Sequence, residues 1–394
     1  MKICIIVDDY LPGSIKVAAK MMHELAVEFV SQGHEVMVVT PGIGIKAKYE
    51  VLDLDNVTVY RFRSGEIKNV SKVKRAINET LLSFRAWHFL KPVFKENPQD
   101  YIIYYSPTIF WGYLVGKLKK LWNVKSYLVL RDIFPQWAID NGILKKNSII
   151  TKYFLWFEKK NYSSANTIGL MSANNLRWFS TYYKGNAKLE LLYNWVADKP
   201  VTLTDKPYRK KLNIEDKVVF FYGGNIGHAQ DMSQILRLAK NMQEYREAYF
   251  VLVGAGDEVE LVRNTIMNEN LTNITLLDPV SQDEFKKMMA EFDIGLFCLN
   301  KNHTTHNFPG KILGYLVQEM PILGSVNPGN DLKEVIEEAG AGFVVEAGND
   351  EALLEKAVML LDAKWRERLA LRGKNLLIKE FLIYNTVSKV LLDK

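Results

Sequence analysis

Glycine-rich turns follow two strand-like segments in the second half of the sequence. The segment Tyr222–Gly227 lies between a predicted strand and a predicted helix, and a second glycine pair follows the next strand. Glycine lets a ligand approach the backbone closely, and a helix N-terminus favours an anion. A tight strand-to-helix turn is the simpler explanation. The pattern nevertheless indicates a phosphate-binding edge, with candidates Gly223, Gly224, Asn225, Gly227, Gly254 and Gly256.

A lysine occupies another turn, in which Pro309 and Gly310 prepare a helix start. A cation in the first turn of a helix opposes the helix dipole, so Lys311 is unfavourable there unless an anion binds at that terminus. A diphosphate would supply that anion, whereas a plain surface lysine is the alternative. A later helix start adds two polar candidates, which either cap the helix or meet a sugar: Asn330 and Asp331.

Other chemistries have less support. The dinucleotide fingerprint G-x-G-x-x-G/A fails because Val259 holds its third position, and the first strand is not followed by one either. No Ser/His/Asp triad, zinc pattern or Walker loop is present. In the first half, Arg131 and Asp132 follow a strand directly and either reach a ligand or close the domain as an ion pair. His306, near Lys311, is a weaker candidate because a lone histidine is more often structural.

The elements that would position these residues alternate between strand and helix along the whole chain. This alternation predicts α/β architecture with parallel sheets covered by helices on both faces. The predicted strands of the first half are 2–7, 35–40, 57–62, 101–105, 126–130, 167–171 and 190–193. Those of the second half are 218–222, 249–253, 274–277, 294–299, 322–324 and 343–345.

A chain of 394 residues is too long for one ordinary core, so two domains are expected. The alternation breaks near residues 194–200, and the polar stretch 198–216 is interpreted as a linker. The predicted domains are therefore 1–197 and 198–375, with a helix at about 376–394 expected to pack back on the first.

Positive charge is concentrated in one aromatic-rich segment. The chain has a formal net charge of +6, and residues 61–96 carry nine Lys or Arg against three Glu. Such a segment suits an anionic membrane surface, whereas the simpler explanation is a helix with a solvated basic face and a buried apolar face. No recognition motif supports nucleic acid. No apolar run is long enough to span a bilayer, so a cytoplasmic protein, peripheral on the membrane, is expected. Cys4 and Cys298 are interpreted as buried and inert.

These motifs resemble the retaining glycosyltransferases of family 4, which have the GT-B fold, over nearly the whole chain. The resemblance rests on residues 32–40 (QGHEVMVVT), 131–135 (RDIFP), 192–196 (LYNWV) and the donor motif at 309–322. Residues 11–28, 130–137 and 306–315 are also similar to N-acetyl-L-fucosamine transferases of O-antigen and capsule synthesis.

The resemblance implies two Rossmann-like domains facing a cleft, with a UDP-sugar on the C-terminal domain and the acceptor on the N-terminal one. It implies neither metal nor cofactor. The donor would be UDP-N-acetyl-L-fucosamine, and the acceptor a polyprenyl-diphosphate-linked sugar at the inner membrane face. It adds Gly13 and Asp278 to the donor-binding residues and assigns Lys16, Arg131 and Trp137 to the acceptor.

The sequence departs from the family pattern at several positions. Gly314 stands where the second glutamate of the donor motif is usual, and the first falls near His306. Gly224 and Ala229 occupy the region where the family has an arginine and a lysine. Lys311 would then be the main side-chain cation on the diphosphate.

We therefore expect a retaining glycosyltransferase in which Lys311 and backbone amides assist departure of the diphosphate, with Asp132 as an orienting residue. Two alternatives remain at this stage. One is a non-hydrolysing UDP-sugar 2-epimerase, and the other is a non-catalytic protein that binds a sugar or a membrane surface.

Overall fold

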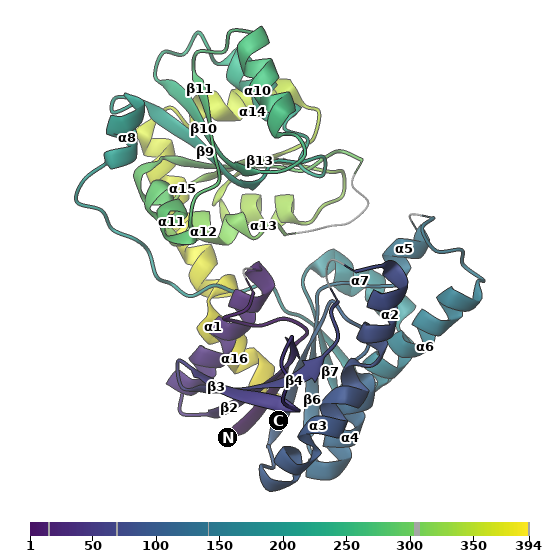
Figure 1. Cartoon of the computed structure of the whole chain (residues 1–394). Helices are drawn as coiled ribbons and strands as arrows, with labels where there is room; N and C mark the ends of the chain where they lie inside the picture. The colour runs from purple at the N-terminus through teal and green to yellow at the C-terminus, as the bar shows by residue number, and fades with distance from the viewer. Residues whose placement is uncertain (15, 68–69, 141, 303–307, 393–394) are drawn as a thin grey trace. The chain divides into compact units, whose positions relative to one another are not determined.

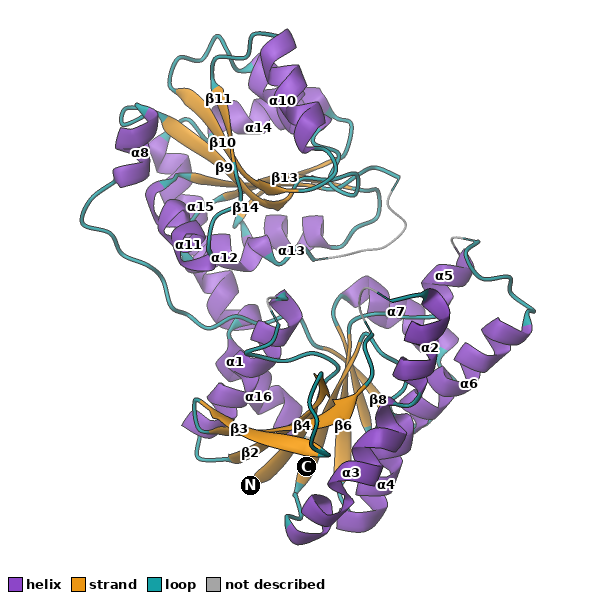
Figure 2. Ribbon diagram, viewed as in Figure 1, coloured by secondary structure: helices purple, strands orange, loops and turns teal. Residues whose placement is uncertain are grey.

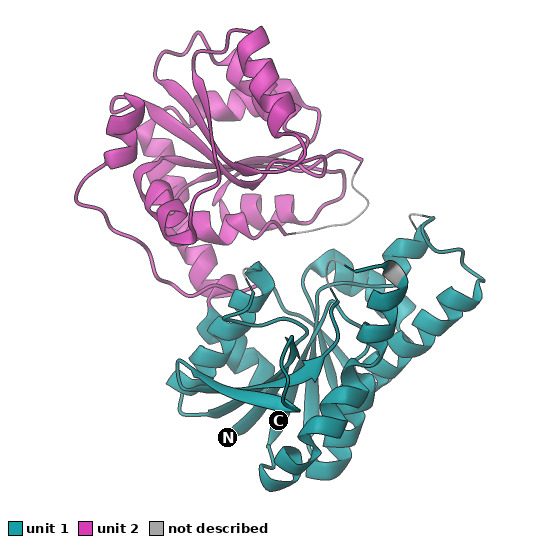
Figure 3. Ribbon diagram, in the orientation of Figure 1, with its two compact units in different colours: residues 1–193, 383–394 teal, residues 194–382 magenta. Residues whose placement is uncertain are grey.

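The computed structural model describes residues 1–14, 16–67, 70–140, 142–302 and 308–392. The candidate His306, and Lys68 of the segment 61–96, lie outside the described residues. The chain divides into two compact units, which are Met1–Tyr193 with Ile383–Lys394 (unit 1) and Asn194–Leu382 (unit 2) (Figure 3). The boundary thus falls four residues before the predicted 197/198 position.

Unit 1 is built on an eight-stranded sheet in the order β3-β4-β2-β1-β5-β6-β7-β8 (Figure 1). Its strands are β1 (Lys2–Ile6), β2 (Glu35–Ile43), β3 (Tyr49–Leu54), β4 (Val57–Ser64), β5 (Tyr101–Ser106), β6 (Lys125–Leu130), β7 (Thr167–Leu170) and β8 (Lys188–Leu191). All neighbours pair in parallel except β3, which runs antiparallel to β4. The central strand β5 is buried along its whole length, as expected for a sheet covered on both faces.

Helices flank this sheet on both faces (Figure 2). They are α1 (Val17–Ser31), α2 (Lys72–Thr80), α3 (Leu82–Glu96), α4 (Gly112–Trp122), α5 (Gln136–Asp140), α6 (Ile149–Ser163), α7 (Ala173–Tyr182) and α16 (Ile383–Leu391). The last of these comes from the far end of the chain and packs on α1. The Tyr101 hydroxyl donates to the Val390 carbonyl at 3.1 Å, which ties α16 to β5.

Part of the basic, aromatic segment 61–96 contributes to this core. Leu82, Leu90 and Phe94 are fully buried, and Lys91 and Lys117 lie over the ring of Trp87. The simpler of the two sequence interpretations, a helix with a buried apolar face, therefore describes α3.

Unit 2 holds a six-stranded parallel sheet in the order β11-β10-β9-β12-β13-β14. Its strands are β9 (Val218–Asn225), β10 (Ala248–Ala255), β11 (Ile274–Leu277), β12 (Ile294–Cys298), β13 (Ile322–Val326) and β14 (Gly342–Glu346). Its helices are α8 (Pro207–Leu212), α9 (Ser233–Asn241), α10 (Val259–Asn268), α11 (Gln282–Glu291), α12 (Lys311–Val317), α13 (Leu332–Ala339), α14 (Asp350–Met359) and α15 (Ala363–Leu376), with a π-helix at Leu377–Phe381. This is the strand order of a dinucleotide-binding Rossmann domain.

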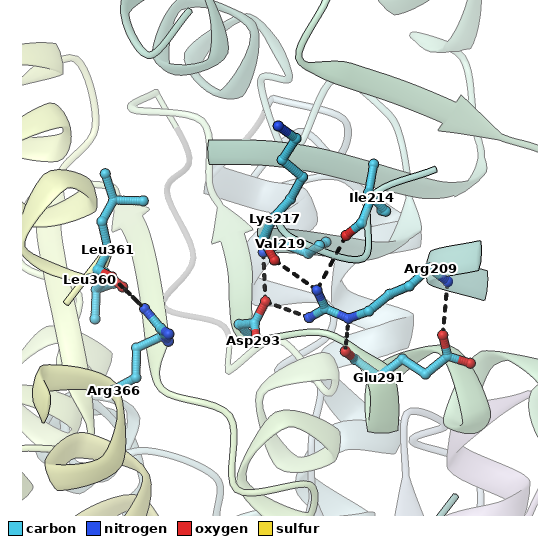
Figure 4. A network of polar contacts seen from close by, with 9 residues as sticks. All are labelled: Arg209, Ile214, Lys217, Val219, Glu291, Asp293, Leu360, Leu361 and Arg366. Atoms are coloured by element: carbon cyan, nitrogen blue, oxygen red, sulfur yellow. Dashed lines mark hydrogen bonds and ion pairs between the residues drawn. The ribbon is translucent and has the colours of Figure 1, made fainter. Parts of the chain in front are cut away.

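The predicted linker 198–216 is wrong in its second half, because α8 belongs to the body of unit 2. The carboxylate of Glu291 accepts from the backbone N–H groups of Tyr208 and Arg209 at 3.0 and 2.9 Å. The Arg209 guanidinium, 3% exposed, donates to the Glu291 and Lys217 carbonyls, both at 2.7 Å, and to the Asp293 carboxylate at 2.6 Å (Figure 4). The polarity of Arg209 therefore reflects buried pairing, whereas its neighbours Lys210 and Lys211 are exposed.

We predict that Arg209→Leu destabilises the protein by about 3–5 kcal/mol, because the substitution leaves a carboxylate and backbone carbonyls without their donor. Urea unfolding followed by circular dichroism measures this change. The neighbouring Lys211 is exposed, so Lys211→Leu should leave the midpoint unchanged. Equal effects of the two substitutions would contradict the assignment.

Candidate functional site

The strand order of unit 2 reverses between β9 and β12, which lie side by side although β10 and β11 separate them in the sequence. In open α/β sheets, ligands bind beyond the carboxyl ends of the strands at such a point. The glycine turn follows β9, and Cys298 ends β12. The fold thus brings the predicted phosphate-binding edge to the position where a ligand is expected.

The glycines of this edge also serve the packing of two strands. The pairing of β9 with β10 continues as far as Gly224 with Gly254 and Ala255 with Asn225. A Cβ atom at Gly254 would collide with the carbonyl oxygen of Gly224, and one at Gly256 with that of Ile226. Close backbone approach therefore explains two predicted donor-binding glycines without a ligand.

Gly223 and Gly227 are restricted by side chains. A Cβ atom at Gly223 would collide with the ring of Phe285, and one at Gly227 with the carboxylate of Asp257. Gly224 differs, because its φ of +118° is a conformation that favours glycine. A Cβ atom on this residue would point towards the Lys311 amine.

Lys311 lies beside this turn, as the sequence analysis expected. A Cβ atom placed on Gly224 would be 3.7 Å from the Lys311 Nζ. The Nζ lies 3.5 Å from the centre of the Tyr222 ring, a cation–π contact. The amine is buried and has no hydrogen-bond partner among the described residues. Burial lowers the pKa of Lys311 to about 7, a shift that the nearby Cys298 only partly opposes.

A hollow of about 320 Å³ opens at the same edge. It is lined by His228 and Ala229 from the loop after β9 and by Asn300 and Asn302 from the loop after β12. The Asn300 side-chain amide donates to the His228 carbonyl at 3.1 Å, which joins the two loops. The hydrogen bond of His228 to Glu258 at 2.8 Å raises the pKa of the imidazole.

Sequence reasoning missed His228 and Asn300. The available signal was position, because His228 comes directly after the last glycine of the turn. Asn300 follows a strand that the sequence analysis had assigned, but no glycine stands next to it.

The remaining donor candidates are placed differently. Pro309 and Gly310 form the turn before α12, next to Lys311. Asn330 and Asp331 are buried, and the side-chain carbonyl oxygen of Asn330 accepts from the Leu332 N–H at 3.1 Å, so it caps α13. Asp278 is exposed after β11, which β10 separates from β9.

In unit 1, charged residues follow the ends of β1 and β6. Burial raises the pKa of both Asp8 and Asp132 to about 6. The Trp137 indole donates to Asp132 and partly opposes that shift. Burial raises the pKa of Tyr105, the charge of Arg131 lowers it, and the charges of Asp8 and Asp132 raise it. Sequence reasoning missed Asp8 as a site residue, although it follows the first strand.

Arg131 is held by backbone groups. Its guanidinium donates to the carbonyls of Leu130, Gly169 and Tyr193 at 3.2–3.3 Å, and so joins the ends of β6, β7 and β8. Burial lowers its pKa to about 10. This arrangement favours the interpretation of Arg131 as a domain-closing residue, and the three carbonyls are among its partners.

Two further candidates lie in the loop after β1. Gly13 is exposed beside the Arg61 side chain, with a Cβ atom placed on it 3.7 Å from Arg61 Nη2. Lys16 is exposed, and its Nζ lies 3.5 Å from the Asp9 carboxylate. Within the part of the chain that the structure describes, no cluster of three His, Cys, Asp or Glu side chains is arranged to hold a metal ion, and no helix is long and apolar enough to cross a bilayer.

Comparison with known proteins decides the class of this site. Residues 204–375, which cover the strands and loops just described, match the family described as Glycosyl transferases group 1. The prediction of a glycosyltransferase enzyme is thereby confirmed, and neither the epimerase nor the non-catalytic alternative has comparable support.

Two relatives are also named as glycosyltransferases. The probable glycosyltransferase WbjE of Pseudomonas aeruginosa is 25% identical over 225 residues, which are 56% of this chain and 55% of that protein. This match thus spans about half the length of the relative. The putative colanic acid biosynthesis glycosyl transferase WcaI of Escherichia coli K12 is 22% identical and is matched over 97% of this chain and 95% of its own length.

Solved structures show the same fold. Sucrose-phosphate synthase from Thermosynechococcus elongatus is similar with a TM-score of 0.72 and 13% identity, over 98% of this chain and 96% of that one. Anabaena Alr3699/HepE in complex with UDP is similar with a TM-score of 0.69 and 13% identity, over 99% and 98%. The predicted fold class, α/β with two Rossmann-like domains of GT-B type, is confirmed.

We predict that Lys311→Met stabilises the ligand-free glycosyltransferase by about 2–4 kcal/mol at pH 6, because it removes a buried ammonium without a hydrogen bond. The folded pKa of about 7 is below the ordinary 10.5, so the folded chain holds fewer protons than the unfolded one between these values. The advantage of the variant is therefore largest below pH 7 and shrinks as the pH rises towards 10.5. Urea unfolding at pH 6, 8 and 10 measures it; a variant less stable than wild type at pH 6 would refute it.

Proposed function

We propose that this glycosyltransferase moves an amino-deoxy sugar, N-acetyl-L-fucosamine, from its UDP conjugate to a saccharide on polyprenyl diphosphate, with retention of anomeric configuration. The product would serve O-antigen or capsule synthesis. The observation that carries the proposal is the Lys311 amine, buried without a hydrogen-bond partner among the described residues and set beside the glycine turn at the switch point of unit 2.

A diphosphate fits this environment chemically. Its oxygens would give the Lys311 ammonium the acceptors that the described side chains do not provide, and its negative charge would offset the cost of burial. Backbone N–H groups near Gly224 and Gly310 would add donors. The similar Anabaena protein binds UDP in its solved complex, and WcaI is named for colanic acid biosynthesis, so both agree with this choice of donor and pathway class.

The chemistry that follows is departure of UDP assisted by a fixed cation. Negative charge grows on the leaving diphosphate in the transition state, and a preorganised donor aimed at that charge lowers the barrier. The acceptor hydroxyl attacks from the face that the diphosphate leaves, and its proton passes to the leaving phosphate. We assign no separate protein nucleophile.

Unit 1 supplies the acceptor side in this proposal. Asp132 and Asp8, whose pKa values are raised to about 6 by burial, remain mostly ionised at neutral pH and can accept hydrogen bonds from sugar hydroxyls. In this proposal Asp132 orients the acceptor, and Lys16 and Trp137 bind it. The enzyme would act in the cytoplasm at the inner face of the membrane, without metal or cofactor.

The defining experiment incubates the purified chain with UDP-N-acetyl-L-fucosamine, with and without lipid-linked acceptor, and follows UDP release. Acceptor-dependent release supports the transferase. Isomerisation of the donor without acceptor would indicate the epimerase, and no turnover with any UDP-sugar would indicate a binding protein.

We predict that Lys311→Ala lowers turnover by about 10²–10³-fold, because it removes a donor that acts on the leaving group. Lys364→Ala, on the exposed face of α15, is the matched control and should turn over as wild type does. Turnover of Lys311→Ala within twofold of the control would remove Lys311 from the mechanism.

We also predict that the dissociation constant for UDP rises with pH above about 7, by up to tenfold per pH unit, since the free protein must take up a proton on Lys311 to bind. Calorimetry in two buffers of different ionisation enthalpy at pH 8 measures that uptake. Lys311→Met should bind weakly and without proton uptake, and a proton-neutral wild type would contradict the role of the amine.

A further inference from the structure

One helix of unit 1 presents a row of apolar side chains to solvent. Ile149, Ile150, Tyr153 and Trp156 recur on α6 at the spacing of one helix face, and Ile149 is 87% and Trp156 60% exposed. Soluble surfaces rarely expose neighbouring large apolar side chains in this way, and such patches mark interaction sites. We define the α6 surface as Ile143, Ile149, Ile150, Tyr153 and Trp156 with the lysines named below.

The opposite face of α6 explains why the helix keeps this orientation. Thr151, Glu158 and Tyr162 are buried on that face. Beside them, the Tyr104 hydroxyl donates to the carbonyl of the buried Asn161 at 2.7 Å. The exposed face is therefore not a core face left open by a loosely packed helix.

Positive charge predominates in the segment that carries the apolar row. Residues 142–163 contain five lysines against one acidic residue, Glu158, and that acid is buried. All five lysines are exposed, and none forms an ion pair within the described residues: Lys145, Lys146, Lys152, Lys159 and Lys160.

A second apolar pair continues the surface on the neighbouring helix α2. Val73 and Ile77, one turn apart, are 70% and 54% exposed. The hydroxyls of Thr80 and Tyr153 are 2.5 Å apart, so the end of α2 contacts α6, and the two helices lie beside each other in Figure 1.

We infer that the α6 surface docks this enzyme on an anionic lipid bilayer, with the apolar row at the acyl boundary and the lysines among the headgroups. The inference rests on the proposed function for its biological sense, since a lipid-linked acceptor lies in a membrane, but not for its physical basis. Isoleucines enter the boundary region, tryptophan and tyrosine prefer the interface, and lysines pair with lipid phosphates. The docking surface is thus centred on α6 and the loop before it, and the segment 61–96 contributes only the exposed pair on α2.

The test measures flotation of the full-length chain with vesicles of phosphatidylcholine alone or mixed with phosphatidylglycerol. Wild type should float with the mixed vesicles, and high salt or the neutral vesicles should release it. Lys145→Glu with Lys146→Glu should lower partitioning by at least about 25-fold, from about fivefold for each of two lysines. Ile149→Ser with Trp156→Ser should lower it by about tenfold or more.

A matched control changes one exposed apolar and one exposed basic residue of α15, Leu371→Ser with Lys364→Glu, and should float as wild type does. Circular dichroism and the urea midpoint confirm that each variant is folded. Failure of wild type to float with the mixed vesicles, or wild-type flotation of Ile149→Ser with Trp156→Ser, overturns the inference. The inference is also overturned if the double variant elutes later than wild type in size-exclusion chromatography. That result would show that the surface joins two copies of the chain.

UDP binding by calorimetry without vesicles separates this inference from the proposed function. The α6 variants should bind UDP as wild type does, because no residue of the donor site is changed. A wild type that floats but binds no UDP would count against the proposed transferase and leave the docking surface standing.

Discussion

A buried ammonium without a hydrogen bond among the described residues is the constraint around which unit 2 is organised. A cation in such a place is costly, and the fold offsets only part of that cost with the ring of Tyr222. The part of the cost that is not offset lowers the pKa of Lys311. A protein that needed only a stable sheet would place an apolar side chain there, so the cost is understandable as preparation for an anion.

The scaffold that holds this cation in place is rigid for identifiable reasons. Gly254 and Gly256 let the ends of β9 and β10 approach until their backbones touch, which fixes the turn beside Lys311. On the amino side of the sheet, Arg209 joins α8 to the end of α11 and the start of β12 through buried hydrogen bonds. Both ends of β9 and the start of β12 are therefore restrained before any ligand arrives.

Much of this was predictable from the sequence, and the failures have physical causes. Strand and helix periodicity located the strands of both sheets except β3, whose alternating, half-exposed residues 49–54 lack a continuous apolar run. The polar residues near Arg209 suggested a linker because buried ion pairs and solvated charges have the same composition. Lys311 was found because a cation at a helix start violates a local rule. His228 was overlooked although it directly follows the glycine turn. Asn300 and the α6 surface depend on which loops and faces meet, and spacing along the chain does not contain that information.

The position of α16 has a consequence for the order in which the enzyme is made. The first 193 residues of the chain form most of unit 1. Its last helix, Ile383–Leu391, is synthesised only after every residue of unit 2. Until then, the face of α1 that α16 covers and the hydroxyl of Tyr101 remain without their native neighbours on the ribosome. Unit 2 can thus complete its core first, although it is encoded second.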